Sequence, residues 1–266
     1  MKPLWLLNLI VLLMTPCVAS TPVWQDEFNQ PPGSGPDPDK WVHDLGDNGW
    51  GNQERQLYTD SRENSFVIED ADATDGRALV IKAVRSADGR YTSARLKTLG
   101  KYAVKHGRIE ARLKLPRGQG IWPAFWMLGD NIDEVSWPQC GEIDVMELVG
   151  HLPGTTHGTL HGPGYSGEHG ITKSTTLPDG AVFADAYHLF AVEWRADRID
   201  WFLDGERFHT VTPADLPEGA TWVFNDAPFH LLLNLAVGGL WPGYPDETTS
   251  FPQEYRIDYV RVYPLE

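Results

Sequence analysis

Glycine and proline divide this chain into short segments, and that feature limits its fold more than any other. The 266 residues include 26 Gly and 20 Pro, which are spread along the chain rather than gathered in one linker. Between them, apolar and polar residues alternate with a period of two, the pattern of a strand with one buried face. No segment has a helical pattern longer than a turn or two. The sequence therefore predicts an all-β protein built from many short strands.

Several segments show the strand pattern clearly. In 108–115, Ile109, Ala111 and Leu113 fall on one face, and a proline ends the run. Asp204 and Gly205 separate two apolar runs, and this pair favours a hairpin turn because glycine tolerates a positive φ. The other predicted strands are 77–84, 187–194, 229–237 and 255–263.

The first twenty residues differ from the rest of the chain. They combine one Lys, an apolar run from Leu4 to Met14, and small residues at 19 and 20, which is the composition of a secretory signal peptide. The run is too short for a membrane-spanning helix, which needs ~20 residues. We therefore expect 1–20 to be a signal peptide and 21–266 one mature domain. The product would be secreted, extracellular or periplasmic, with no membrane association after cleavage.

Charge limits the partners of the mature chain. The formal net charge is −15 and becomes −16 when Lys2 leaves with the signal peptide, since −15 minus the +1 of that lysine is −16. An acidic surface disfavours nucleic acids, anionic lipids and sulfated polymers, which bind through basic patches. A neutral ligand is predicted instead. Only Cys140 remains after cleavage, so no internal disulfide can form. A monomer is the default expectation.

Three carboxylates lie close together in 141–148, GEIDVMEL, which otherwise has the composition of a buried strand. Strict alternation would place Glu142 and Asp144 on one face and bring Met146, not Glu147, beside them. A one-residue bulge near Met146 would return Glu147 to the acidic face. Two carboxyls ~5–5.5 Å apart can act as acid and nucleophile at a sugar bond. A solvated strand face or a calcium site would explain the same three acids.

Tryptophans accompany this strand in the sequence. The chain has 11 Trp, and Trp122, Trp126 and Trp241 lie in fragments rich in Gly and Pro. Flat indole faces match the C–H faces of sugar rings and leave polar edges for hydroxyls. Each Trp taken alone could be a core residue, but tryptophans at loop ends favour the lining of a cleft.

With these fragments the sequence resembles glycoside hydrolase family 16, and within it the laminarinase-like endo-β-1,3-glucanases. The matching segments cover nearly all of the mature chain in order: 24–28, 49–60, 91–98, 107–129, 140–148, 157–167, 201–205, 228–246 and 251–263. The resemblance implies a β-jelly-roll sandwich of two curved antiparallel sheets with an open concave cleft. It also implies a neutral β-glucan polysaccharide as partner and no cofactor for catalysis.

The resemblance assigns a role to each acid. It implies that Glu142 is the nucleophile, that Glu147 is the acid/base, and that Asp144 holds the charge and orientation of the nucleophile. The extra Met146 matches the bulged form of the motif found in laminarinases, which mixed-linkage β-1,3-1,4-glucanases typically lack. Some relatives that act on galactans share the bulge.

The resemblance also implies contacts with sugar. Asn52 and Arg95 would lie on the glycone side, where Trp122 and Trp126 form an aromatic floor. Arg95 could instead join a structural ion pair.

Four further expectations concern the cleft and possible metal sites. His161 would be a cleft histidine near the acid/base, and Trp241 would stack a sugar or simply cover a loop. A metal site at His157 and His161 is disfavoured because no third ligand has suitable spacing. A structural calcium would be held by Glu27, Asp258 and the carbonyl of Gly76, although ordinary surface acids explain both carboxylates almost as well.

The predicted function is retaining endo-hydrolysis of β-1,3-glucan through a covalent glycosyl-enzyme. Two alternatives stay open. The same enzyme class could act on mixed-linkage glucan, agarose or another polysaccharide. The chain could also be a β-glucan-binding protein without activity, although such relatives have usually lost the paired glutamates, which are both present here.

Overall fold

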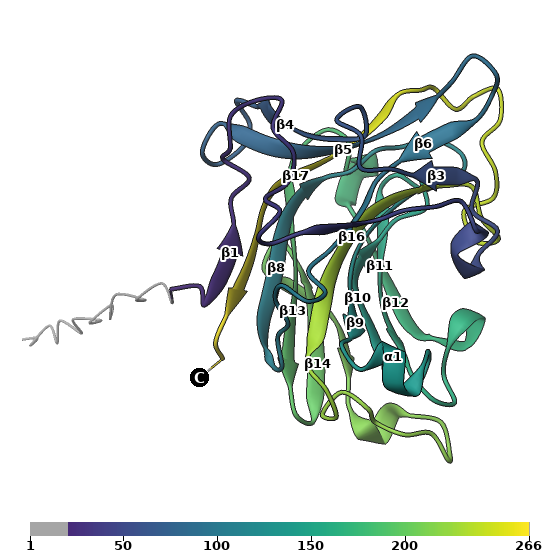
Figure 1. Cartoon of the computed structure of the whole chain (residues 1–266). Coiled ribbons are helices and arrows are strands. Elements are labelled where there is room, and N and C mark those ends of the chain that lie inside the picture. Colours follow the sequence, from purple (N-terminus) through teal and green to yellow (C-terminus); the bar gives the residue numbers. More distant parts are fainter. Residues whose placement is uncertain (1–20, 266) are drawn as a thin grey trace, which may run out of the picture.

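Two curved β-sheets packed face to face form the protein (Figure 1), in a computed structural model that describes residues 21–265. The larger sheet has ten strands in the order β15-β14-β13-β8-β17-β5-β6-β3, with β1 paired to β17 and β4 to β5. The smaller sheet has seven strands in the order β12-β11-β10-β9-β16-β7-β2. The pairing is antiparallel except between β3 and β6. This confirms the predicted sandwich, while the predicted signal peptide 1–20 lies outside the described residues.

The bounds of the elements are as follows. The larger sheet contains β1 (Trp24–Asp26), β3 (Gln56–Tyr58), β4 (Ser65–Glu69), β5 (Arg77–Arg85), β6 (Tyr91–Ser93), β8 (Gly107–Lys114), β13 (His188–Arg195), β14 (Arg198–Leu203), β15 (Glu206–Val211) and β17 (Gln253–Tyr263). The smaller sheet contains β2 (Val42–Asp44), β7 (Arg95–Lys97), β9 (Ile121–Gly129), β10 (Glu142–Glu147), β11 (Thr155–His161), β12 (Ile171–Thr176) and β16 (Phe229–Val237). The helical elements are α1 (Ile132–Val135) and the 3-10 turns Gly49–Gly51, Gly167–His169, Pro178–Gly180 and Pro213–Asp215.

Sequence periodicity located the long strands correctly. The prediction 229–237 coincides with β16, and β5, β8, β13 and β17 cover the other predicted segments with shifts of one or two residues at their ends. Asp204 and Gly205 form the turn between β14 and β15 with φ values of 49° and 85°, as a hairpin of this kind requires. No helix among residues 21–265 is long and apolar enough to cross a membrane.

A continuous hydrophobic core fills the space between the two sheets. Leu231, Leu233 and Leu235 of β16 contribute to it, and so do the fully buried indoles of Trp194 and Trp201 from the larger sheet. Cys140 is also buried, with its thiol reduced, and burial raises its pKa to about 11. It is therefore a packing residue, as expected from its place beside the acids.

We predict that Leu233→Ala lowers the free energy of unfolding by about 3 kcal/mol, because the lost methyl groups leave a cavity in a close-packed core. Leu233 is 0% exposed. Leu45→Ala is the matched control, since Leu45 is 59% exposed and should change stability by less than about 0.5 kcal/mol. Urea denaturation of both variants measures the difference, and equal losses would contradict the assignment of Leu233 to the core.

Candidate active site

A β-bulge in β10 brings the three acids to one face. The pairing of β10 with β9 matches Asp144 to Trp126 and then Met146 to Phe125, so Val145 is the extra residue. Beyond the bulge, Glu147 lies opposite Ala124, while Glu142 lies opposite Leu128. Ala124, Trp126 and Leu128 alternate along β9 and share a face, and directly paired residues project to the same side of a sheet. The three acids therefore share the outer face, and the predicted bulge is confirmed.

The bulge also explains the burial pattern of the strand. Ile143, Val145 and Met146 all belong to the hydrophobic core on the inner face. Two successive core residues are possible only where the alternation is broken, because a regular strand would send one of them outward. The apolar side chains on one side therefore fix the register of the acids on the other.

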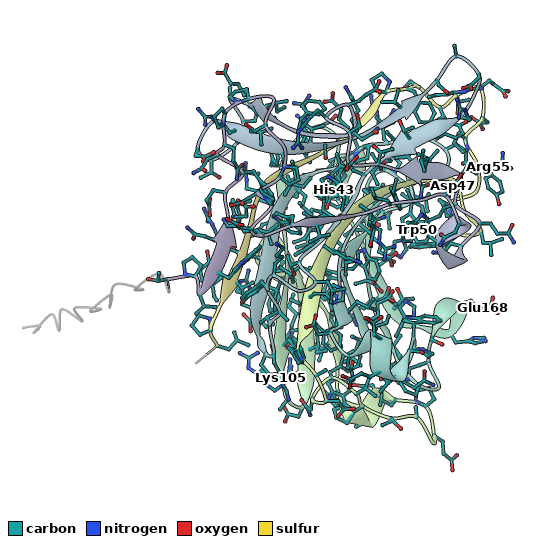
Figure 2. All side chains as sticks on the ribbon, viewed as in Figure 1. His43, Asp47, Trp50, Arg55, Lys105 and Glu168 are labelled. Carbon is teal, nitrogen blue, oxygen red and sulfur yellow. The ribbon has the colours of Figure 1, made fainter. Side chains whose placement is uncertain are left out.

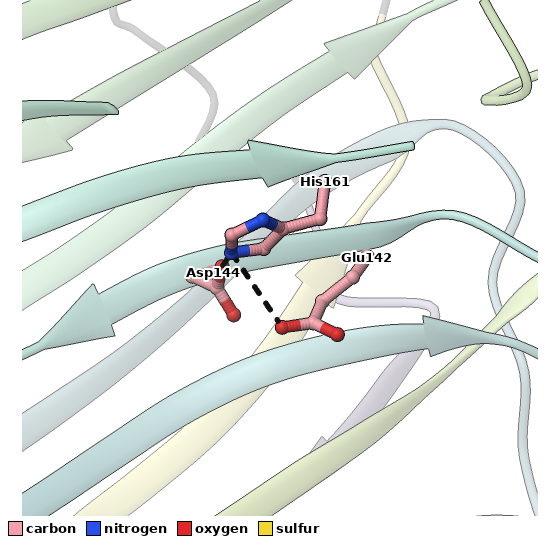
Figure 3. A group of neighbouring side chains, drawn as sticks. All are labelled: Glu142, Asp144 and His161. Atoms are coloured by element: carbon pink, nitrogen blue, oxygen red, sulfur yellow. Dashed lines mark ion pairs between the residues drawn. The ribbon is translucent and has the colours of Figure 1, made fainter. Parts of the chain in front are cut away.

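Glu142 has two close neighbours that can stabilise its charge. Trp137 Nε1 donates to Glu142 Oε2 at 2.8 Å, and the Trp137 side chain is 43% exposed. His161 of β11 lies across the strand pair, with its Nε2 3.9 Å from Glu142 Oε1 and 3.3 Å from Asp144 Oδ2 (Figure 3). The close contacts of His161 are thus with the first two acids, whereas it had been expected near Glu147. The residue paired with Glu147 is His157.

Glu147 lies among aromatic rings. Trp122 Nε1 donates to Glu147 Oε1 at 3.1 Å. The ring of Trp241 stands edge-on to Trp122 at 5.5 Å and edge-on to His157 at 5.0 Å. Trp241 is 44% exposed. Its indole is therefore available to a ligand above Glu147.

Burial raises the pKa of all three acids. The pKa of Glu142 rises to about 8, first through burial and second through the negative charge of Asp144. Burial also raises the pKa of Asp144, to about 7. The pKa of Glu147 lies well above its ordinary value, again through burial and then the charge of Asp144. The Glu142–Asp144 pair can thus lose a proton near neutral pH, while Glu147 holds its proton to higher pH than an ordinary glutamate.

Three of the four predicted glycone-side residues, Asn52, Arg95 and Trp126, belong to a second cluster along the same face. The fourth, Trp122, lies beside Glu147 instead. The Arg95 guanidinium lies 4.7 Å from the centre of the Trp50 ring and 4.8 Å from that of Trp126. Its Nε also pairs with Asp44 Oδ2 at 3.0 Å. The structural ion pair, one of the two expectations for Arg95, is therefore present. The loop between β2 and β3, which carries Trp50, projects at one corner of the molecule (Figure 2).

A buried polar network connects Asn52 to the indole of Trp126. Asn52 Nδ2 donates to Glu54 Oε1 at 3.1 Å, and Tyr58 Oη donates to Glu54 Oε2 at 3.3 Å. Asn234 Nδ2 donates to Tyr58 Oη at 3.2 Å, and Trp126 Nε1 donates to Asn234 Oδ1 at 2.7 Å. Burial raises the pKa of Glu54. Satisfied networks of this kind fix side-chain orientation, so the network aims Trp126 at the outer face.

The residues expected to hold calcium do not fit that ion in their present arrangement. Both carboxylate oxygens of Glu27 accept from Arg261 at 2.8 Å. The Asp258 carboxylate accepts from Thr74 and from Arg112, and the Gly76 carbonyl accepts from Asp70 N at 3.0 Å. Arginines beside both carboxylates would repel a cation. Within residues 21–265 one group of three potential metal ligands lies close together, namely Glu142, Asp144 and His161. The ion pairs of His161 with the two carboxylates already explain why these side chains lie so near one another.

Trp137 and Trp50 belong to the site although the sequence pattern did not single them out. Trp137 precedes a proline shortly before the acidic strand, the same Trp-Pro setting as Trp122 and Trp241, so that signal was present. Trp50 lies in the GWGN fragment beside Asn52. Glu54 carried no signal, because a single acid in a loop does not reveal that it will be buried.

A jelly-roll sandwich that gathers carboxyls and indoles on one open sheet face is typical of an enzyme that cuts polysaccharides. The comparisons with known proteins specify the class: the chain belongs to the glycosyl hydrolases family 16, whose model matches residues 53–261. A β-glucanase of Rhodothermus marinus is 42% identical over 252 residues, 91% of this chain and 84% of that protein.

Solved structures agree with this assignment. The laminarinase catalytic domain of Thermotoga maritima is 48% identical with a TM-score of 0.84, covering 93% of this chain and 99% of that one. The endo-β-1,3-glucanase of Pyrococcus furiosus is 46% identical with a TM-score of 0.82, covering 92% and 94%. The chain is therefore a glycoside hydrolase, and enzymes of this family need no catalytic cofactor.

The raised pKa of Glu142 predicts a pH-dependent cost to stability. Because the folded state binds this proton more tightly than the unfolded state, stability is lost as pH rises from about 4.5 towards 8. Glu142→Gln removes that loss, so the variant should be more stable than wild type by up to about 4 kcal/mol at pH 8 and equal to it near pH 4. Thermal unfolding across this range measures the effect. Glu168→Gln, at a side chain 90% exposed, should show none.

Removing the donor to Glu142 should change the pH dependence of activity. In Trp137→Phe the ring remains but the hydrogen bond that lowers the pKa of Glu142 is lost. We expect the acidic limb of the kcat/KM profile to move to higher pH. Trp222→Phe is the control, since the Trp222 indole bonds to Ala196 O at 3.0 Å, away from the acids. An unmoved acidic limb in the Trp137 variant would contradict the role given to this bond.

Proposed function

We propose that this family 16 enzyme is a retaining endo-hydrolase of β-1,3-glucan, with Glu142 as nucleophile and Glu147 as acid/base. The observation that carries the proposal is the bulge, which sets two partly buried carboxyls with raised pKa values on one face. An ionised nucleophile and a protonated acid must coexist at the working pH. The Glu142–Asp144 pair can supply the first and Glu147 the second.

The reaction proceeds in two displacements. Glu147 gives its proton to the glycosidic oxygen while a carboxylate oxygen of Glu142 attacks the anomeric carbon, so the bond to the leaving sugar breaks and a glycosyl ester forms. Glu147, now ionised, takes a proton from water, and the resulting hydroxide attacks the same carbon and releases Glu142. Two inversions give net retention. No metal or organic cofactor enters either step.

Asp144 and His161 complete the electrostatics of the first step. A proton that leaves Glu142 can be held by Asp144, whose carboxyl is 2% exposed and has a raised pKa. His161 lies beside the remaining negative charge, since its Nε2 is within 3.9 Å of an oxygen of each carboxylate. The indole of Trp137 supports the ionised form of Glu142 by donating a hydrogen bond.

The indoles support a neutral polysaccharide as substrate. Trp137 and Trp241 are each more than two-fifths exposed, and they lie beside Glu142 and Glu147 respectively. Exposed rings on both sides of the acids suit a chain of sugars that extends past the cut bond, as an endo-acting enzyme needs. Asn52, Arg95 and Trp126 would bind the glycone side. The bulged acidic motif and the relatives described above favour β-1,3 linkages.

The setting of the enzyme belongs to the same proposal. We expect secretion, because the sequence of 1–20 has the composition of a signal peptide. An acidic net charge of −15 suits a soluble monomer that acts on a neutral polymer. Calcium is not part of the proposal, since the expected carboxylates are bonded to arginines.

Replacing the nucleophile gives the most specific test. Glu142→Ala should lower reducing-sugar release from laminarin by at least 10⁴-fold, because no covalent intermediate can form. Azide should restore turnover of an activated aryl β-laminaribioside and give a glycosyl azide of inverted configuration. The small anion can occupy the space that the glutamate side chain leaves. Product analysis by NMR determines the configuration.

Controls separate the role of Glu142 from general damage. Glu63→Gln, at an exposed loop position, should keep wild-type activity. Glu147→Gln should lose activity on laminarin without azide rescue of the inverted product. Wild-type protein that binds laminarin but never shortens it would overturn the hydrolase proposal and favour a binding role. Preferred cleavage of mixed-linkage glucan or agarose would overturn only the linkage.

A further inference from the structure

The bulge in β10 is supported from behind by two buried side chains. A bulge takes main-chain groups out of the regular ladder, and they then need other partners. Trp201 Nε1 donates to Asp144 O at 2.8 Å, and Thr156 Oγ1 donates to Glu147 O at 3.2 Å. These carbonyls belong to the residues on either side of the irregular step, because the pairing with β11 shifts between Asp144 and Glu147. The two side chains thus bond the main chain on either side of the bulge.

Trp201 comes from the opposite sheet. It lies on β14, it is 0% exposed, and its ring packs against that of His209 at 4.8 Å. The indole lies against Gly158 of β11, where an added Cβ would be 2.4 Å from Trp201 Cδ1 and 2.8 Å from Nε1. Glycine at this position therefore leaves the space through which the indole reaches the carbonyl.

We propose that Trp201 and Thr156 are positioning residues for catalysis: through the carbonyls of Asp144 and Glu147 they hold the bulge that sets the separation of Glu142 and Glu147. Gly158 belongs to the same arrangement, because it leaves room for the Trp201 indole. The proposal rests on the roles given to the two glutamates under Proposed function. None of the three residues reaches the outer face, so each acts through the backbone of β10.

Loss of either donor should lower the rate of the reaction rather than weaken substrate binding. Loss of the indole donor leaves a buried carbonyl without its partner, and the local backbone can relieve this by relaxing the bulge. A displacement of the order of 1 Å in a catalytic group can cost about 100-fold in rate. Sugar contacts made by Trp122, Trp137 and Trp241 would change little, because these rings are on other strands and loops.

Trp201→Phe tests the proposal, with Trp194→Phe as its matched control. Both indoles are fully buried and donate to a main-chain carbonyl, Trp194 to Phe224 O at 3.1 Å. We expect both variants to lose similar stability, but only Trp201→Phe to lower kcat on laminarin, by 10- to 100-fold, with KM within about twofold of wild type.

The pH profile gives a readout that general destabilisation would not change. If the bulge relaxes, Glu147 moves relative to Glu142 and Asp144 on β10 and to His157 and His161 on β11. Weaker repulsion from the two acids would lower its pKa, so the alkaline limb of kcat/KM should move to lower pH in Trp201→Phe and stay in place in Trp194→Phe.

The outcomes are distinct. Equal kcat values for the two variants, corrected for the folded fraction, with unmoved pH limbs would overturn the proposal. If Trp201→Phe does not fold, Thr156→Val decides instead, because it removes the second donor with little change in volume: lower kcat with a moved alkaline limb supports the proposal, and wild-type kinetics overturn it. Wild-type protein inactive on laminarin would refute the proposed function, and this inference with it, whereas active wild-type protein with unchanged variants would overturn this inference alone.

Discussion

The β-bulge at Val145 is the constraint on which the rest of this structure depends. Without it, Glu147 would point into the core and Met146 would lie among the acids, since side chains alternate along a regular strand. With it, the three carboxyls share the outer face while Ile143, Val145 and Met146 stay in the core. Hydrophobic burial on the inner face therefore fixes the position of charge on the outer one.

Close packing of the two sheets lets one carry chemistry while the other supports it. The smaller sheet supplies the acids, His161 and the indoles of Trp122 and Trp126. The larger sheet supplies Trp201, whose indole passes Gly158 and bonds behind the acids. Like charges held together in a buried site cost stability, and their raised pKa values measure that cost. Function and stability thus oppose each other at β10, as is common where an active site needs strained or desolvated groups.

Local patterns were sufficient to predict much of the fold. Period-two alternation located the long strands such as β16, and the Asp204–Gly205 turn follows from the need for positive φ. The alternation broken at Met146 was enough to predict a bulge, because only one register places all three acids together. Contacts between distant segments were not predictable: nothing in the local sequence shows that Trp201 reaches Asp144, that Trp137 bonds Glu142, or that Glu54 is buried. The predicted calcium site failed to fit for a similar reason. Arg112 pairs with Asp258 and Arg261 pairs with Glu27, and the local sequence around the two acids shows neither contact.

Through the bulge in β10, Glu142 is placed to act as the nucleophile and Glu147 as its partner. Trapping the enzyme with an activated 2-deoxy-2-fluoro-laminaribioside and mapping the labelled peptide by mass spectrometry tests this directly. We expect the label on Glu142, in an enzyme that regains activity as the ester hydrolyses. A label on Glu147 or Asp144, or rapid turnover without any covalent species, would contradict it.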